Sequence, residues 1–239
     1  PNGGIPSAYA HILFSPRSID FANLPFENPV DKSTVYYRSG NDIPNPLWVV
    51  KNYKNTSVVN RFFNSTSLNY DFTDNFSVTY RLGLDTYSEV QEAMYNKGGG
   101  SGVALEARQG YYRTINITNT IWNQDLILNW KKEFSDKFSM SALLGGNSRY
   151  DNYAQNGVAS QGQLAFGLFR HSNFQNSSSN DAYSGGTMTY TQEERRYGVY
   201  ANVTFDYSDY LFLNFSARND WTSTVEKENR SILYPGASV

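Results

Sequence analysis

The residues of this chain that could carry out covalent chemistry are few and scattered. There are no cysteines among the 239 residues, which excludes disulfides, thiol catalysis and cysteine metal sites. His11 and His171 have no acidic or histidine neighbours at ligand spacing, so we expect loop residues, no metal site and no cofactor. Glu193 and Glu194 are adjacent, and adjacent strand residues point to opposite faces, which prevents a shared acid–base task. With no nucleophile beside a base, we expect no enzyme.

The glycine-rich run at residues 98–102 is a second motif that could suggest chemistry. It follows Lys97, but it lacks the Lys-Ser/Thr ending of a phosphate-binding loop and the strand-to-helix setting that such a loop needs. We therefore expect a flexible loop.

Flat rings and polar side chains remain, and these suit non-covalent contact with a large polar solute such as a sugar. The candidates for stacking on the solute are Trp48, Tyr53, Tyr111, Tyr112, Phe166 and Trp221. The candidates for a hydrogen-bonding wall are Arg81, Asp85, Asn123, Arg218 and Asp220. The alternative is that these residues only pack loops together.

The composition narrows the class of protein that could hold such residues. Aromatic residues make up 16% of the chain, yet the mean hydropathy is −0.56. A transmembrane barrel has this combination, because aromatics lie at both lipid interfaces and polar side chains line the inner wall. The net charge of −2 offers no basic field for nucleic acid. No apolar run is long enough for a membrane helix, and the first residues do not resemble a signal peptide, so we expect a piece of a longer chain.

Strict alternation of apolar and polar residues predicts β-strands. In residues 76–85 every even position is apolar, and the run at 66–72 precedes it across a short turn. The same unit recurs at 125–131 with 138–145 and at 199–206 with 211–218. The sequence therefore predicts about six antiparallel strands in three hairpins.

Long connections separate the hairpins. We expect hairpins within 55–220, long loops at about 87–111 and 151–194, a loop region at 1–54, and a loop with the start of the next strand at 221–239. Outer-membrane barrels have short periplasmic turns and long extracellular loops, whereas a soluble β-sandwich, the alternative, has no reason for this asymmetry. The pattern predicts an all-β transmembrane barrel segment in a bacterial outer membrane, in contact with its lipid.

The last third of the chain resembles the SusC/RagA family of TonB-dependent outer-membrane transporters. Its strings are Arg-Tyr-Gly-Val-Tyr at 196–200, Tyr-Leu-Phe-Leu-Asn at 210–214, Ala-Arg-Asn-Asp-Trp at 217–221 and Lys-Glu-Asn-Arg at 227–230, before Tyr-Pro at 234–235. Asn-Pro-Leu-Trp at 45–48 is similar more weakly.

The resemblance implies a barrel of about 22 strands with a plug inside, a SusD-like surface lipoprotein as partner, and import of glycans, oligopeptides or similar nutrients driven by TonB. It also implies that the wall candidates could contact the plug, and that Arg218 and Asp220 belong to the architecture. The expected six strands cannot close a barrel, so the remaining barrel, the plug and the TonB contact must lie elsewhere. A passive porin-like or structural barrel shares the strands but not these strings.

Overall fold

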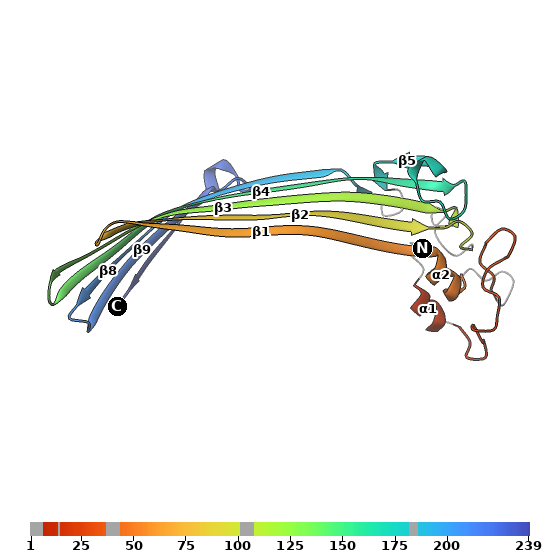
Figure 1. The fold of residues 1–239 in the computed structure, drawn as a ribbon, viewed down its shortest axis with the longest axis horizontal. Helices are drawn as coiled ribbons and strands as arrows, with labels where there is room; N and C mark the ends of the chain where they lie inside the picture. The colour runs from red at the N-terminus through yellow and green to blue at the C-terminus, as the bar shows by residue number, and fades with distance from the viewer. Residues whose placement is uncertain (1–6, 14, 37–43, 101–107, 182–185) are drawn as a thin grey trace. The chain divides into compact units, whose positions relative to one another are not determined.

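The computed structural model describes residues 7–13, 15–36, 44–100, 108–181 and 186–239, and these form mainly antiparallel strands (Figure 1). An eight-stranded sheet has the order β1-β2-β3-β4-β8-β9-β10, and β5 pairs with β4. The strands of this sheet are β1 (Tyr53–Thr73), β2 (Phe76–Tyr95), β3 (Tyr111–Ser135), β4 (Phe138–Gln163), β5 (Phe174–Ser178), β8 (Tyr190–Tyr207), β9 (Leu211–Thr222) and β10 (Ser231–Ser238). A second, two-stranded sheet contains β6 (Asn180–Asp181) and β7 (Gly186–Thr187). Within the described residues the large sheet is open, with β1 and β10 at its edges.

The three predicted hairpins are confirmed. Two residues separate β1 from β2 and β3 from β4, and three residues separate β8 from β9. In the third turn Ser208 and Asp209 have φ angles of 57° and 55°, a left-handed conformation that Asp tolerates because its side chain bonds locally. The Asp209 backbone N–H donates to Asp206 at 3.0 Å, which fixes this turn.

The strands are longer than the sequence predicted, and this shortens the expected loops. β2 continues to Tyr95 and β4 to Gln163, while β8 begins at Tyr190, so the main connections are 96–110 and 164–189. The prediction failed because alternation fades after residue 86, whereas pairing with neighbouring strands continues. β10 is the expected next strand. With β10 and the short β5, the sheet has two strands more than the predicted six.

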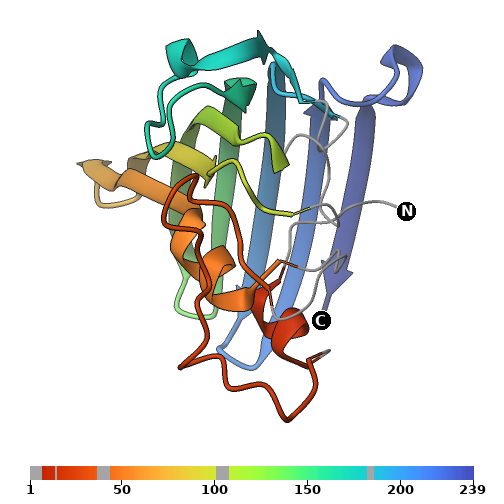
Figure 2. The same cartoon turned by 90° about the vertical axis from the view of Figure 1, so that its right-hand side faces the viewer.

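Helices occur at the start of the chain, where only a loop region was expected. These are α1 (Ala8–Leu13) and α2 (Pro46–Asn52), which lie side by side in Figure 2. Asn45 begins α2, since its side chain accepts the Leu47 backbone N–H at 2.9 Å, and Pro46 suits the first helical position. Among the described residues, no helix has both the length and the apolar character needed to cross a membrane.

The described chain forms two compact units. The first contains Pro1–Val59, Ser88–Ile117 and Gln155–Tyr190, and the second contains Asn60–Tyr87, Thr118–Ala154 and Thr191–Val239. Strands β1 to β4 therefore contribute residues to both units. The two units are described separately below.

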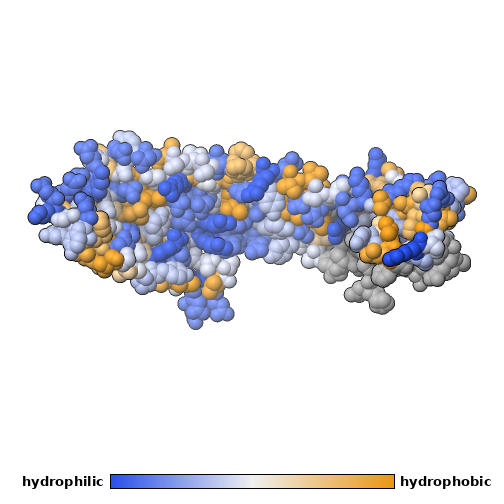
Figure 3. Space-filling model, turned by 90° about the horizontal axis from the view of Figure 1, so that it is seen from below, coloured by the Kyte–Doolittle hydropathy of each residue, from blue (hydrophilic) through white to orange (hydrophobic). Residues whose placement is uncertain are grey.

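The register of β8 and β9 shows how the second unit separates its two faces. Tyr200 lies opposite Arg218 and Asn202 opposite Ser216, whereas Val203 lies opposite Phe215. Because side chains alternate along each strand, the first two pairs share one face and the third belongs to the other. We call these the polar face and the apolar face. The face of this unit seen in Figure 3 carries mostly hydrophilic side chains with hydrophobic ones among them.

Candidate functional site

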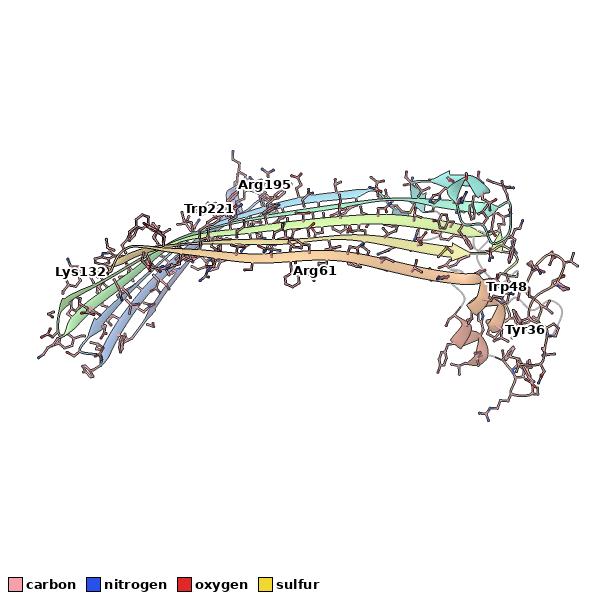
Figure 4. The ribbon with its side chains drawn as sticks, in the orientation of Figure 1. Tyr36, Trp48, Arg61, Lys132, Arg195 and Trp221 are labelled. Atoms are coloured by element: carbon pink, nitrogen blue, oxygen red, sulfur yellow. The ribbon has the colours of Figure 1, made fainter. Side chains whose placement is uncertain are left out.

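Ion pairs occupy the polar face of the second unit. Arg61, which lies midway along β1 (Figure 4), donates from Nε to Asp85 on β2 at 2.8 Å. Three further pairs join residues two apart on one strand: Arg149 with Asp151, Arg196 with Glu194, and Arg218 with Asp220. This spacing places both partners on the same face of a strand. Each of these four arginines therefore has a carboxylate partner, and in three of the pairs the partner lies on the same strand.

Amide groups connect neighbouring strands on the same face. The Asn147 Nδ2 on β4 donates to Asn123 at 3.2 Å and to Asp125 at 2.9 Å, both on β3. On β8 and β9, Asn202 and Asn214 exchange hydrogen bonds at 3.2 and 3.1 Å. Such a surface offers donors and acceptors of both kinds to a polar solute.

Two glycines make room for the cluster around Tyr200 and Arg218. The Arg218 guanidinium lies 5.5 Å from the centre of the Tyr200 ring, a cation–π geometry. A Cβ at Gly145 would lie 2.1 Å from the Tyr200 ring, and a Cβ at Gly198 would lie 2.5 Å from Asp220 Oδ1 and 2.8 Å from Arg218 Nη2. The strings at 196–200 and 217–221 are thus parts of one packed cluster.

A groove of about 530 Å³ lies beside this cluster. This volume is within the range of about 300 to 1,000 Å³ that is typical of small-molecule sites. Its lining includes Asn123, Asn147, Arg149, Glu194, Arg196, Arg218, Asp220, Arg230 and Tyr234. Thr222, Thr224, Tyr197, Trp221 and Ile232 complete the lining. The groove is therefore mixed, with apolar groups beside the polar ones and with guanidinium groups prominent.

Four aromatic rings pack in series in the first unit. Trp48 contacts Tyr53 at 5.4 Å between ring centres, Tyr53 contacts Tyr95 at 4.7 Å, and Tyr95 stacks on Tyr111 at 5.5 Å. Trp48, Tyr95 and Tyr111 are at most 1% exposed, and Trp48 Nε1 donates to the Lys32 carbonyl at 2.8 Å. We call these residues the ring series. Trp48 and Tyr111 are buried in this core, whereas Tyr53 is half-buried. The burial supports the packing alternative for Trp48 and Tyr111.

A second cluster in the first unit surrounds Tyr112 and His171. Their rings lie 4.6 Å apart, and the Tyr112 hydroxyl donates to Glu92 at 2.7 Å. The His171 ring nitrogens lie 2.8 Å from the Ser160 hydroxyl and 2.9 Å from the Thr114 hydroxyl. Burial lowers the pKa of His171, so the neutral imidazole is favoured. His171 therefore packs a short 3-10 helix (His171–Asn173) against the strands.

Buried amides tie the strand ends of the first unit together. Asn96, after β2, donates to Asn52 at the end of α2 at 3.0 Å and accepts from Gln163 at the end of β4 at 3.1 Å. The Gln163 side chain also accepts the Lys97 backbone N–H at 3.0 Å. We call Asn52, Asn96 and Gln163 the amide chain. It satisfies polar groups that burial would otherwise leave unpaired.

Of the remaining predicted site residues, Trp221 lines the groove together with Arg218 and Asp220, whereas Phe166 and Arg81 are not part of its lining. Trp221 shares the apolar face with Tyr197, its partner in the register, and so lies on the face opposite to that of Arg218 and Asp220. Phe166 is half-buried in the turn after β4, and Arg81 is exposed on β2. His11 lies in α1, not in a loop. Of the run at 98–102, Ser101 and Gly102 lie outside the described residues, whereas Gly98 and Gly100 adopt φ angles of 101° and 86°.

Three arginines of the groove were not among the predicted site residues: Arg149, Arg196 and Arg230. The signal that could have found the first two is the opposite charge two positions away, at Asp151 and Glu194. Each such pair lies on one strand face. No comparable signal marks Arg230, which reaches the groove from the end of the loop before β10.

Comparison with known proteins shows which family the chain belongs to. The sequence matches the family described as TonB dependent receptor-like, beta-barrel over residues 10–239. The chain belongs to this family. No curated protein matches the sequence.

Solved structures support the fold. The RagAB peptide transporter matches with a TM-score of 0.70 and 16% identity, over 87% of this chain and 22% of that chain. The RagAB peptide importer matches in its closed-closed state with a TM-score of 0.70 and 15% identity, over 87% and 23% of the two chains. Its open-open state matches with a TM-score of 0.69 and 16% identity, over 87% of this chain and 22% of that chain. The chain therefore spans less than a quarter of the length of the structures it matches.

Proposed function

We propose that this chain is a section of the wall and outer loops of a TonB-dependent importer in the bacterial outer membrane. The observation that carries the proposal is the separation of faces in β8 and β9, taken with the family match. The polar face lines the lumen, the apolar face contacts lipid, the short turns face the periplasm, and the long connections face outward. Lumen-facing Arg218 and Asp220 then hold the wall in shape, and Trp221 belongs to the lipid-facing aromatic belt.

The rest of the importer supplies the other parts of the function. These are the remaining strands of a barrel of about 22, a plug, the TonB contact and a SusD-like surface lipoprotein. The cargo is an oligopeptide, a glycan or a similar nutrient. Oligopeptides come first for testing, since the similar solved structures are titled as a peptide transporter and a peptide importer.

Cysteine labelling tests the assignment of faces. The chain has no native cysteine, and Ser216 and Ala217 are adjacent small residues on β9 that the register places on opposite faces. In full-length importer without other cysteines, Ser216→Cys should react with a water-soluble maleimide in intact membranes. Ala217→Cys should react only after detergent extraction. Equal labelling of both in membranes would refute the assignment.

Uptake measurements test the active mechanism. Cells that contain the full-length importer should accumulate labelled oligopeptides only when TonB is present. Uptake that persists without TonB would favour the alternative, a passive porin-like barrel.

A further inference from the structure

Four arginines from four segments of the second unit line the same groove. They are Arg149 on β4, Arg196 on β8, Arg218 on β9 and Arg230 immediately before β10. The register supports their common face, because Arg218 lies opposite both Tyr200 on β8 and Tyr234 on β10, and Arg196 lies opposite Thr222. Residues far apart in the sequence thus present guanidinium groups to one volume of about 530 Å³.

The charges of the groove do not balance. Two carboxylates, Glu194 and Asp220, lie in the lining with the four guanidinium groups. Asp151 adds a third, since it contacts Arg149 at 3.3 Å and lines the neighbouring hollow. Asp125 is a fourth carboxylate beside the groove, since it accepts from the lining residue Asn147 at 2.9 Å and acts electrostatically on Arg218. The excess of guanidinium groups over carboxylates therefore lies in the lining itself. An anion that enters the groove meets net attraction, which low ionic strength strengthens.

The guanidinium groups retain donors for another acceptor. Each has five N–H donors in a planar arrangement that suits a carboxylate. In the described contacts Arg196 donates to Glu194 from Nε, Arg149 donates to Asp151 from one terminal nitrogen, and Arg230 donates from Nε to the Val225 carbonyl at 2.9 Å. Arg218 is different, because Nε bonds both Asp220 oxygens at 2.9 and 2.8 Å. Arg218 therefore belongs to the scaffold, and the other three can bind a ligand.

The groove also has a defined place along the strands. β9 is 12 residues long, and the groove residues Arg218, Asp220 and Thr222 lie at its end away from the short turn after β8. Under the proposed orientation, this end lies toward the outer mouth of the lumen. A solute that arrives from outside would reach it early.

We propose that this groove is a subsite for a carboxylate group of the transported solute, bound by Arg149, Arg196 and Arg230. The inference rests on the proposed function, because the solute must pass along the polar face. It names a chemical class of cargo. The importer should bind oligomers that carry carboxylates more tightly than their neutral counterparts.

Binding of matched probes to the purified full-length importer tests the inference. The first pair is a hexapeptide of Gly, Ser and Asp with a free C-terminus and its Asn-containing, C-terminally amidated counterpart. The second pair is a galacturonate hexamer and its methyl ester, which separates sugar acids from peptide carboxylates. We expect at least one acidic probe to bind roughly tenfold more tightly than its neutral counterpart at low salt.

Neighbouring arginines on opposite faces supply the matched variants. Arg196→Gln should remove most of the preference for the acidic probe, whereas Arg195→Gln should keep it, because Arg195 lies on the apolar face over the Tyr150 ring at 5.3 Å. Glu194→Gln should increase the affinity for the acidic probe by removing a competing carboxylate. Such a gain cannot come from misfolding.

The results that overturn the inference are specific. They are equal or absent binding of both members of each pair, equal losses in Arg195→Gln and Arg196→Gln, or no gain in Glu194→Gln. TonB-dependent uptake in cells and the cysteine labelling are measured separately. Failure of the subsite is therefore distinguishable from failure of the proposed function.

Discussion

The ring of Tyr200 on β8 lies so close to Gly145 on β4 that a Cβ at position 145 would come within 2.1 Å of the ring. No side chain other than hydrogen fits there without moving the ring. The glycine thus sets the position of Tyr200, and Tyr200 in turn supports the guanidinium of Arg218 at 5.5 Å. The contact between β4 and β8 thus also determines where Arg218 of β9 lies.

The first prediction concerns this contact. Gly145→Ala should destabilise the barrel by about 1–3 kcal/mol, because an added methyl group in a packed site forces neighbouring side chains to shift. Gly146→Ala is the matched control, since nothing lies within 4 Å of a Cβ built there. Thermal unfolding of the full-length protein measures both. A Tyr200→Ser change should suppress the effect of Gly145→Ala, and similar losses in both alanine variants would contradict the contact.

The second prediction concerns the ring series. Trp48→Ala should cost about 3–5 kcal/mol of local stability, because it removes a fully buried ring and leaves a cavity. Trp48→Phe should cost less, because it keeps a buried ring. It still costs some stability, because the hydrogen bond to the Lys32 carbonyl is lost. Hydrogen exchange at residues 48–53 and 95–111 measures the change, with Val50→Ala, 69% exposed on the same helix, as control. Unchanged protection with weakened solute binding would instead indicate a stacking role.

The third prediction concerns Asn173. Its side chain donates to the Ala165 and Leu168 carbonyls at 2.8 Å each and accepts the Ala165 backbone N–H at 3.0 Å. Asn173→Ala should loosen the turn at 164–168 by about 1–3 kcal/mol, because three backbone groups of the turn lose their hydrogen bonds to the buried Asn173 side chain. Asn176→Ala, on exposed β5, should change little. Hydrogen exchange of the turn distinguishes the two, and equal protection in both variants would disprove this role.

The fourth prediction is a pH dependence around His171. Burial holds its pKa below the ordinary 6.5, so above pH 6.5 the segment has its full stability. As the pH falls below 6.5, the unfolded segment binds a proton before the folded one does, and stability decreases until the folded pKa is passed. Hydrogen exchange at 164–178, corrected for intrinsic rates, should show lower protection at pH 5 than at pH 7.5.

Two controls test the assignment to His171. Replacement by Gln should flatten the pH dependence, since Gln does not titrate. Glu92, which accepts from the Tyr112 hydroxyl, is a carboxylate beside the cluster. If Glu92→Gln flattened the profile and His171→Gln did not, the effect would belong to the carboxylate.

The sequence by itself determined the strand type, the three short turns and the separation of faces. Alternation is a local property with a period of two, so residues such as Val203 and Ser216 reveal their faces without knowledge of their neighbours. The family strings at 196–230 are equally local, and they led to the correct class of barrel.

Only the tertiary structure decided which residues meet. Register and cross-strand contact depend on residues far apart in the chain, as with Gly145 and Tyr200 or Arg149 and Arg230. The same holds for Trp48 and Tyr111, which resemble exposed stacking residues in the sequence but lose nearly all contact with solvent through Tyr53 and Tyr95. A ring's type shows that it can stack, and only its neighbours show whether a face remains for a ligand.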